Sequence, residues 1–187
     1  MGELPQLSLP GWIVLSVVDE SPTHGFAVAA LTAQDGDVGR AWHVPRPIVY
    51  RSLDRLGELG LVRVASTEPG SRGPQRSILT TTRAGTSATR AWLRRPVAHV
   101  RDMRSELLVK LALLARHGMA VDDLIAAQRS AFVPMLAALE HRRGTGADTG
   151  FGQVLATWRI ENVRAAIRFL DEVDLIRAGL REPGGRA

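Results

Sequence analysis

The sequence of 187 residues contains no cysteine, a single lysine and few aromatic residues. Without cysteine it has no disulfides, thiolate zinc sites, iron–sulfur clusters or cysteine nucleophiles. Its apolar segments, such as Trp12–Val18, are far shorter than the roughly 20 residues that a membrane helix needs. The N-terminus has neither a basic segment nor a small-residue cleavage site after the apolar run, which argues against a secretory signal. We therefore expect a cytoplasmic protein without a membrane partner.

Sequence patterns typical of enzymes are also missing. There is no phosphate-binding Walker loop, no nucleophile elbow and no dinucleotide-binding fingerprint. The triplet Asp148-Thr149-Gly150 is typical of aspartic proteases, but it lies in a glycine-rich loop and has no second copy. The histidines are scattered without metal-ligand spacing, at His24, His43, His99, His117 and His141. We expect no enzymatic activity, no cofactor and no metal site.

Positive charge is concentrated in one segment of the chain. Lysine and arginine total 24, of which only Lys110 is lysine, against 19 acidic residues. Residues 1–40 carry a net charge of −4, whereas residues 41–95 hold ten arginines and three acidic residues, a net charge of +7. Residues 96–187 are close to balanced, with 13 basic and 11 acidic residues. A basic segment beside a balanced one is typical of a protein in which one part binds a polyanion.

The first half of the sequence predicts three short helices followed by a hairpin. We expect helices over residues 9–20 and 26–33, and a third from Pro45 to about Leu59, where Gly60 ends it. Strands are expected over residues 61–64 and 75–81, and Thr82 can cap a fourth helix over residues 83–94. This order is that of a winged helix-turn-helix, in which the third helix faces DNA.

The second half of the sequence predicts helices alone, over about residues 102–117, 123–142 and 152–177. A linker is expected to begin at Arg95-Pro96. The predicted fold class is therefore mainly α with a small β-hairpin. A winged helix-turn-helix DNA-binding domain is expected over residues 1–95, and a helical dimerisation domain over residues 96–187.

The third helix and the hairpin supply the candidate DNA-contacting residues. Val49, Leu53 and Leu56 form an apolar stripe, which leaves basic and aromatic side chains on the other side of the helix. Arginine binds phosphates or guanine edges, and tyrosine donates to phosphates. A solvated charged face is the alternative for the helix alone, but arginines in a glycine-flanked hairpin favour DNA binding. The predicted contacts are Arg46, Tyr50, Arg51, Arg55, Arg72 and Arg76.

Several motifs, in this order and spacing, resemble the PadR-type transcriptional regulators. The motifs are Ser21-Pro22-Thr23-His24-Gly25-Phe26, Val49-Tyr50-Arg51-Ser52-Leu53-Asp54-Arg55-Leu56 with Gly60-Leu61-Val62, Thr82-Arg83-Ala84-Gly85 with Ala91-Trp92-Leu93, and the segments 106–111 and 169–172. The chain departs from the family at Phe26, where a tyrosine is usual, and at Pro45, where a serine or threonine cap is frequent. The resemblance implies a dimeric repressor that binds an operator in double-stranded DNA and releases it when a small, often aromatic, effector binds.

The last predicted helix carries more apolar surface than one small domain covers, which favours a homodimer. The residues predicted for this interface are Trp158, Ile160, Val163, Ile167 and Leu170. A thick intramolecular core is the alternative for them. Trp92 and Trp158 are candidates for stacking on an aromatic effector, although a buried tryptophan more often serves packing.

The rival to a sequence-specific DNA-binding regulator is a winged-helix protein-interaction module that no longer binds DNA. The departures at Phe26 and Pro45 keep this alternative open. The salt dependence of duplex binding distinguishes the two functions. The affinity of a DNA-binding regulator falls steeply as salt rises, because arginine–phosphate contacts weaken, whereas the module binds no duplex at any salt concentration.

Overall fold

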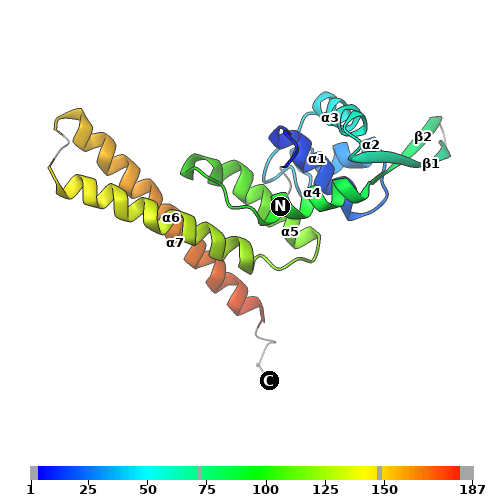
Figure 1. Cartoon of the computed structure of the whole chain (residues 1–187). Helices are drawn as coiled ribbons and strands as arrows, with labels where there is room; N and C mark the ends of the chain where they lie inside the picture. The colour runs from blue at the N-terminus through cyan, green and yellow to red at the C-terminus, as the bar shows by residue number, and fades with distance from the viewer. Residues whose placement is uncertain (1–3, 71–72, 147–148, 182–187) are drawn as a thin grey trace, which may run out of the picture. The chain divides into compact units, whose positions relative to one another are not determined.

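The computed structural model describes residues 4–70, 73–146 and 149–181 (Figure 1). The chain forms two compact units. The first unit consists of Met1–Arg95 together with Arg104–Ala120, and the second consists of Pro96–Met103 together with Val121–Ala187. Within the described ranges, no helix combines the length and apolar character needed to cross a membrane.

The first unit has the predicted winged-helix order of three helices, a hairpin and a further helix. The elements are α1 (Leu9–Glu20), α2 (Gly25–Leu31), α3 (Arg46–Glu58), β1 (Val62–Gly70), β2 (Gly73–Thr81), α4 (Arg83–Arg94) and α5 (Leu108–Arg116). The strands β1 and β2 are antiparallel and pair from Val62 with Thr81 to Gly70 with Gly73, with irregularities along the register. Both strands are longer than the sequence predicts, because pairing continues into the expected turn. The predicted fold class is confirmed.

Local signals in the sequence set the helix ends. The Thr82 hydroxyl caps α4 as predicted, accepting a hydrogen bond from the backbone N–H of Gly85 at 3.2 Å. Gly60 follows α3 with a φ of 65°, the left-handed conformation that glycine adopts without strain. Pro45 gives α3 no side-chain cap. At α2, His24 Nδ1 takes the capping role and accepts from the N–H of Ala27 at 3.1 Å.

The core of the first unit forms around α1, most of which is buried. The predicted stripe of Val49, Leu53 and Leu56 on α3 is buried against it. From α4, the indole of Trp92 stacks on that of Trp12, with ring centroids 5.2 Å apart and planes 2° from parallel. This apolar packing fixes α3 and the base of the hairpin relative to each other.

The first unit extends past the division expected at residue 95, because α5 packs with the winged helix. Lys110 on α5 is fully buried and donates to the backbone carbonyl of Arg95 at 2.7 Å. Its ammonium also pairs with Glu106 at 2.6 Å and lies 4.8 Å from the ring centroid of Trp92. Burial lowers the pKa of the Lys110 ammonium, opposed by its hydrogen bond to Glu106.

A second ion-pair cluster joins the C-terminal end of α5 to the end of α1 and to Asp37. The guanidinium of Arg116 donates to both carboxylate oxygens of Glu20 at 2.7 and 2.6 Å, and to Asp37 at 3.0 Å. The segment before α5 is irregular, with a 3-10 turn η1 (Val100–Asp102) and a π turn η2 (Met103–Leu107). The single helix predicted over residues 102–117 is therefore regular only in its second half.

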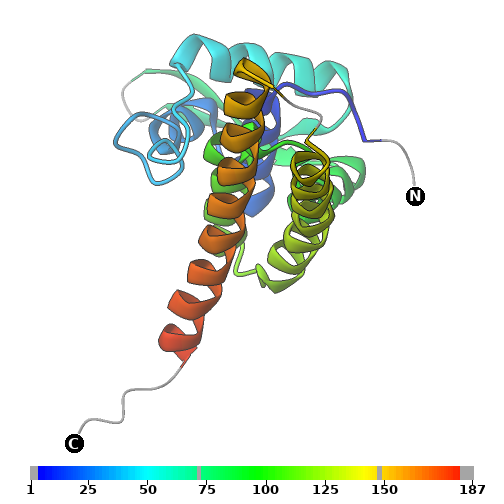
Figure 2. The same ribbon diagram turned by 90° about the vertical axis from the view of Figure 1, so that its left-hand side faces the viewer.

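The second unit contains α6 (Asp122–Gly144) and α7 (Phe151–Arg181), which lie side by side (Figure 2). Their buried seam includes Leu124, Ile125 and Phe132 from α6 and Ile160 and Leu170 from α7. Ion pairs flank the seam, such as Arg129 to Asp171 and Asp174, Arg164 to Glu140 and Arg177 to Asp122. The two helices therefore cover much of each other's apolar surface.

Candidate nucleic-acid interface

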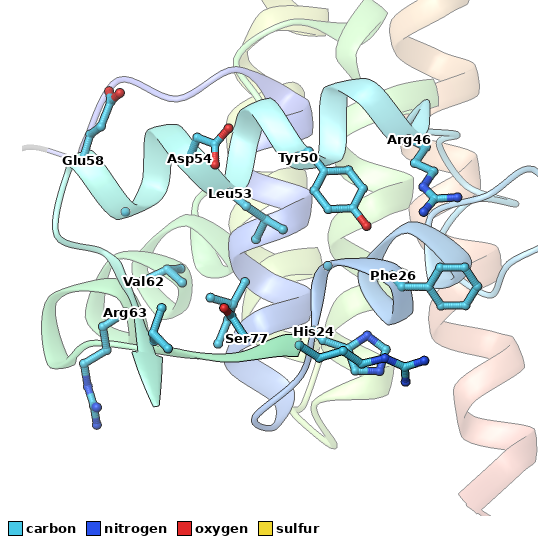
Figure 3. A pocket seen from close by; sticks show the side chains of 15 residues that line it. His24, Phe26, Arg46, Tyr50, Leu53, Asp54, Glu58, Val62, Arg63 and Ser77 are labelled. Atoms are coloured by element: carbon cyan, nitrogen blue, oxygen red, sulfur yellow. The ribbon is translucent and has the colours of Figure 1, made fainter. Parts of the chain in front are cut away.

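A groove of about 800 Å³ lies between α3 and the hairpin (Figure 3). The start of α2 lines one side, through His24 and Phe26. The helix α3 contributes Arg46, Tyr50 and Leu53, and β1 and β2 contribute the rest of the lining, including Val62, Arg63, Arg76, Ser77 and Leu79. We call this space the groove below.

Backbone pairing brings the turn before α2 against the hairpin. The N–H of Thr23 donates to the carbonyl of Leu79 at 3.0 Å, and the N–H of Leu79 donates back at 2.6 Å. This bridge places His24 beside β2. Because His24 Nδ1 accepts the N–H of Ala27, the neutral ring carries its proton on Nε2, which leaves that nitrogen as a hydrogen-bond donor.

Gly25 allows the ring of Tyr50 to pack against the start of α2. A Cβ atom at position 25 would lie 2.8 Å from Tyr50 Cε1 and 3.2 Å from Leu53 Cδ1. Any larger residue would therefore push Tyr50 from its position. The tyrosine remains 40% exposed, and Figure 3 shows it pointing from α3 toward α2.

Two aromatic rings flank the guanidinium of Arg46 at the open end of the groove. The Arg46 Cζ atom lies 5.3 Å from the ring centroid of Phe26 and 5.7 Å from that of Tyr50. Both distances are within the range of cation–π attraction. Phe26 is 59% exposed, so this apolar side chain is accessible to a binding partner. The rings hold the guanidinium at the surface without neutralising its charge.

Hydrogen-bond donors predominate among the polar groups of the groove. Arg46, Arg63 and Arg76 provide guanidinium groups, and Tyr50 and Ser77 provide hydroxyls. The acidic residues Asp54 and Glu58 also line the groove, and Asp54 follows Tyr50 by one turn of α3, about 40° further around the helix. A groove with this chemistry fits an anionic ligand.

A second surface, the outer face of α3, consists of Pro47, Arg51, Asp54 and Glu58. Successive residues turn by 100° around a helix, which puts these four side chains opposite the buried stripe of Val49 and Leu56. All four are exposed to solvent. Next to them, Arg55 forms an ion pair with Glu58 at 2.9 Å.

The predicted DNA contacts divide into three groups. Arg46, Tyr50 and Arg76 line the groove, Arg51 and Arg55 lie exposed on α3, and Arg72 lies outside the described residues. The groove also contains four residues that are not among the predicted DNA contacts, namely His24, Phe26, Arg63 and Ser77. For Arg63, the alternation of Leu61-Val62-Arg63-Val64 was an available signal, since alternate side chains of a strand share a face. Nothing in the sequence brings Phe26 next to Arg46.

The residues predicted for a dimer interface have different surroundings. Ile160, Val163 and Leu170 are buried in the second unit and Ile167 is half-buried, so intramolecular packing, the alternative left open above, occupies most of this set. Trp158 is 65% exposed. Phe151 and Val154 are exposed apolar side chains nearby on α7, and the set predicted for the interface does not include them.

Of the two tryptophans predicted to bind an effector, Trp92 is only 3% exposed. Besides Trp12 and Lys110, it contacts Glu106, which accepts a hydrogen bond from its indole nitrogen at 3.1 Å. These neighbours leave no free ring face for a ligand. Within the part of the chain that the structure describes, no group of three or more His, Asp or Glu side chains could hold a metal ion.

No protein-family model matches the chain, and no curated protein matches it. Among solved structures, it is similar to PadR of Bacillus subtilis in complex with operator DNA, with a TM-score of 0.46 and 16% identity over 89% of this chain and 97% of that one. It is also similar to smu.1604c of Streptococcus mutans UA159, with a TM-score of 0.41 and 13% identity over 87% and 96% of the two chains. Bacillus subtilis PadR in complex with p-coumaric acid gives a TM-score of 0.41 and 15% identity over 89% and 96%.

Proposed function

We propose that this protein binds double-stranded DNA through α3 and the hairpin and regulates transcription. The observation that carries the proposal is the groove lined by hydrogen-bond donors beside the outer face of α3. In a winged helix, the third helix enters the major groove and the hairpin approaches the neighbouring minor groove. The phosphate backbone that separates the two DNA grooves then lies between α3 and the hairpin.

The chemistry of the groove agrees with that placement. Phosphate oxygens only accept hydrogen bonds, and Arg46, Tyr50 and Ser77 can all donate to them. Arg63 and Arg76 add positive charge from the hairpin side. The aromatic rings beside Arg46 restrict its guanidinium, which lowers the entropy lost when it binds a phosphate. This arrangement favours DNA binding over the protein-interaction module.

We further propose that two copies associate through the start of α7. Phe151, Val154 and Trp158 are spaced by three and four residues, so they lie on one side of the helix. All three are exposed, and they form an apolar strip that a second copy would cover. A dimer presents two α3 helices to two half-sites, as a repressor that occupies a promoter requires. The exposure of Trp158 and its neighbours supports an interface there, whereas Ile160 is buried within the chain.

We also propose control by a small aromatic effector, on the basis of the motifs that resemble the PadR-type regulators. Of the two predicted tryptophans only Trp158 is exposed, so in the proposed dimer such a ligand would lie at the interface between the two copies. The test is release of bound DNA by a panel of aromatic acids, with Trp158→Leu as the variant expected to lose the response. If none of the aromatic acids releases the bound DNA, control by an aromatic effector is refuted.

The decisive experiment is a titration of purified protein with a labelled duplex from upstream of its own gene. The duplex is a first choice because many regulators bind beside their own genes. We expect tight binding that weakens steeply between two salt concentrations, and weaker binding to a scrambled duplex. An absence of duplex binding at low salt would refute DNA binding and favour the protein-interaction module.

A further inference from the structure

An unpaired carboxylate lies in the middle of the outer face of α3. Asp54 is exposed, and among the residues that the structure describes it has neither an ion-pair nor a hydrogen-bond partner. Glu58, one turn further along, is held by Arg55 at 2.9 Å. Arg51, one turn earlier, makes no ion pair with Asp54. The negative charge of Asp54 is therefore fully available to a ligand.

A lone carboxylate on a DNA-binding helix needs a reason, because it repels phosphates. Asp54 lies at the edge of the groove, about 40° around α3 from Tyr50, and it is among the residues opposite the buried stripe of Val49 and Leu56. The outer face is also the part of α3 farthest from the buried stripe, so it enters the major groove most deeply in the proposed complex. Asp54 is then aimed at the edges of bases and not at the backbone.

An ionised carboxylate can only accept hydrogen bonds, which restricts the bases it tolerates. Guanine and thymine present acceptor oxygens in the major groove and repel it. Adenine offers its N6 amino group, but the neighbouring N7 is an acceptor. Cytosine offers its N4 amino group without an acceptor beside it on the same base. Cytosine is the base whose edge best complements this side chain.

We propose that Asp54 determines sequence specificity by accepting a hydrogen bond from the N4 amino group of a cytosine in each half-site. The inference rests on the proposed DNA-binding function. It assigns a role to an acidic residue in the most basic segment of the chain, where charge alone would predict another arginine. It also gives α3 two tasks on adjoining parts of its surface, with Arg46 and Tyr50 binding the backbone and Asp54 reading a base.

The test is selection of bound duplexes from a random-sequence library, followed by sequencing, for the wild type and Asp54→Asn. We expect one position of each half-site to prefer cytosine in the wild type. In Asp54→Asn the preference at that position should move to adenine, because an amide can donate to N7 and accept from N6. Competition titrations should show the preference for cytosine over adenine falling by about five- to 150-fold.

Two matched variants control for charge alone. Glu172→Gln removes the same charge from an exposed position on α7, and Asp123→Asn removes it from an exposed position on α6. Both should keep the cytosine preference. If Asp54→Asn strengthens binding to all duplexes equally and leaves the selected sequence unchanged, Asp54 only repels phosphate and the inference is overturned.

The experiment also separates this inference from the function on which it rests. A wild type that binds duplexes in a salt-sensitive manner, but selects no cytosine that depends on Asp54, contradicts the base-reading role and leaves DNA binding intact. A wild type that binds no duplex contradicts both. Thermal unfolding of each variant checks that the exposed substitutions leave the fold unchanged.

Discussion

Replacing Arg46 by alanine should change the salt dependence of DNA binding by a calculable amount. Each phosphate that a protein neutralises contributes about −0.9 to the slope of log K against log salt concentration. Arg46 provides one such charge per copy, held at the surface by Phe26 and Tyr50. In the proposed dimer both copies lose it, so the slope should become less steep by about 1.8. Between 50 and 200 mM salt the variant should then lose roughly tenfold less affinity than the wild type.

The measurement is a series of fluorescence-anisotropy titrations of one duplex at four or more salt concentrations. Arg168→Ala is the matched control, because Arg168 is an exposed arginine on α7 in the second unit. It removes the same charge and should leave the slope unchanged. Parallel salt dependences for Arg46→Ala and the wild type would refute the placement of a phosphate in the groove, even if the affinity of the variant were lower.

Three further predictions test other parts of the structure. Phe26→Leu should weaken DNA binding about two- to fivefold per copy, because it removes a cation–π contact with Arg46. The slope of log K against log salt concentration should stay the same, because no charge is removed, and a changed slope in the titrations would contradict this. Trp158→Glu should give monomers in sedimentation at unchanged helicity, and Leu175→Glu should stay dimeric; a dimeric Trp158→Glu moves the interface elsewhere. The free energy of unfolding should rise with pH between the lowered pKa of Lys110 and its ordinary value of 10.5, because in this range the unfolded state binds more protons than the folded state. Urea denaturation at a series of pH values should show this rise in the wild type and not in Lys110→Met.

The winged-helix order was predictable because its signals are local. The apolar stripe on α3, the glycine after it and the threonine before α4 each act within a few residues, and the structure confirms all three. The hairpin was predictable as a motif but not in length. Its pairing runs to Gly70 and Gly73, through a segment whose proline and glycine content predicted a loop.

The groove could be predicted only in part because its residues come from four separate elements. A basic helix face predicted Arg46 and Tyr50, but the position of His24 depends on the backbone bridge between Thr23 and Leu79. That bridge joins residues far apart in sequence and leaves no periodic pattern. The choice of residues for an interface on α7 was limited in a related way. Ile160 and Trp158 are both apolar, and only the packing of α6 decides which of them is covered.

The division of the chain at residue 95 was inferred from Arg95-Pro96, a local pattern typical of linkers. That pattern contains no information about the contacts that Lys110 makes further along the chain. Apart from Lys110, every basic residue counted in the net charge of this chain is an arginine. The single lysine therefore indicates a site where a guanidinium does not fit. Lys110 is completely buried, and a compact ammonium at the end of a flexible stem fits between the ring of Trp92 and the carbonyl of Arg95. Arginine is larger, stays charged and needs partners for five N–H groups. The same contact ties α5 to the end of α4, so the helix expected to belong to the dimerisation domain instead completes the core of the unit that carries α3.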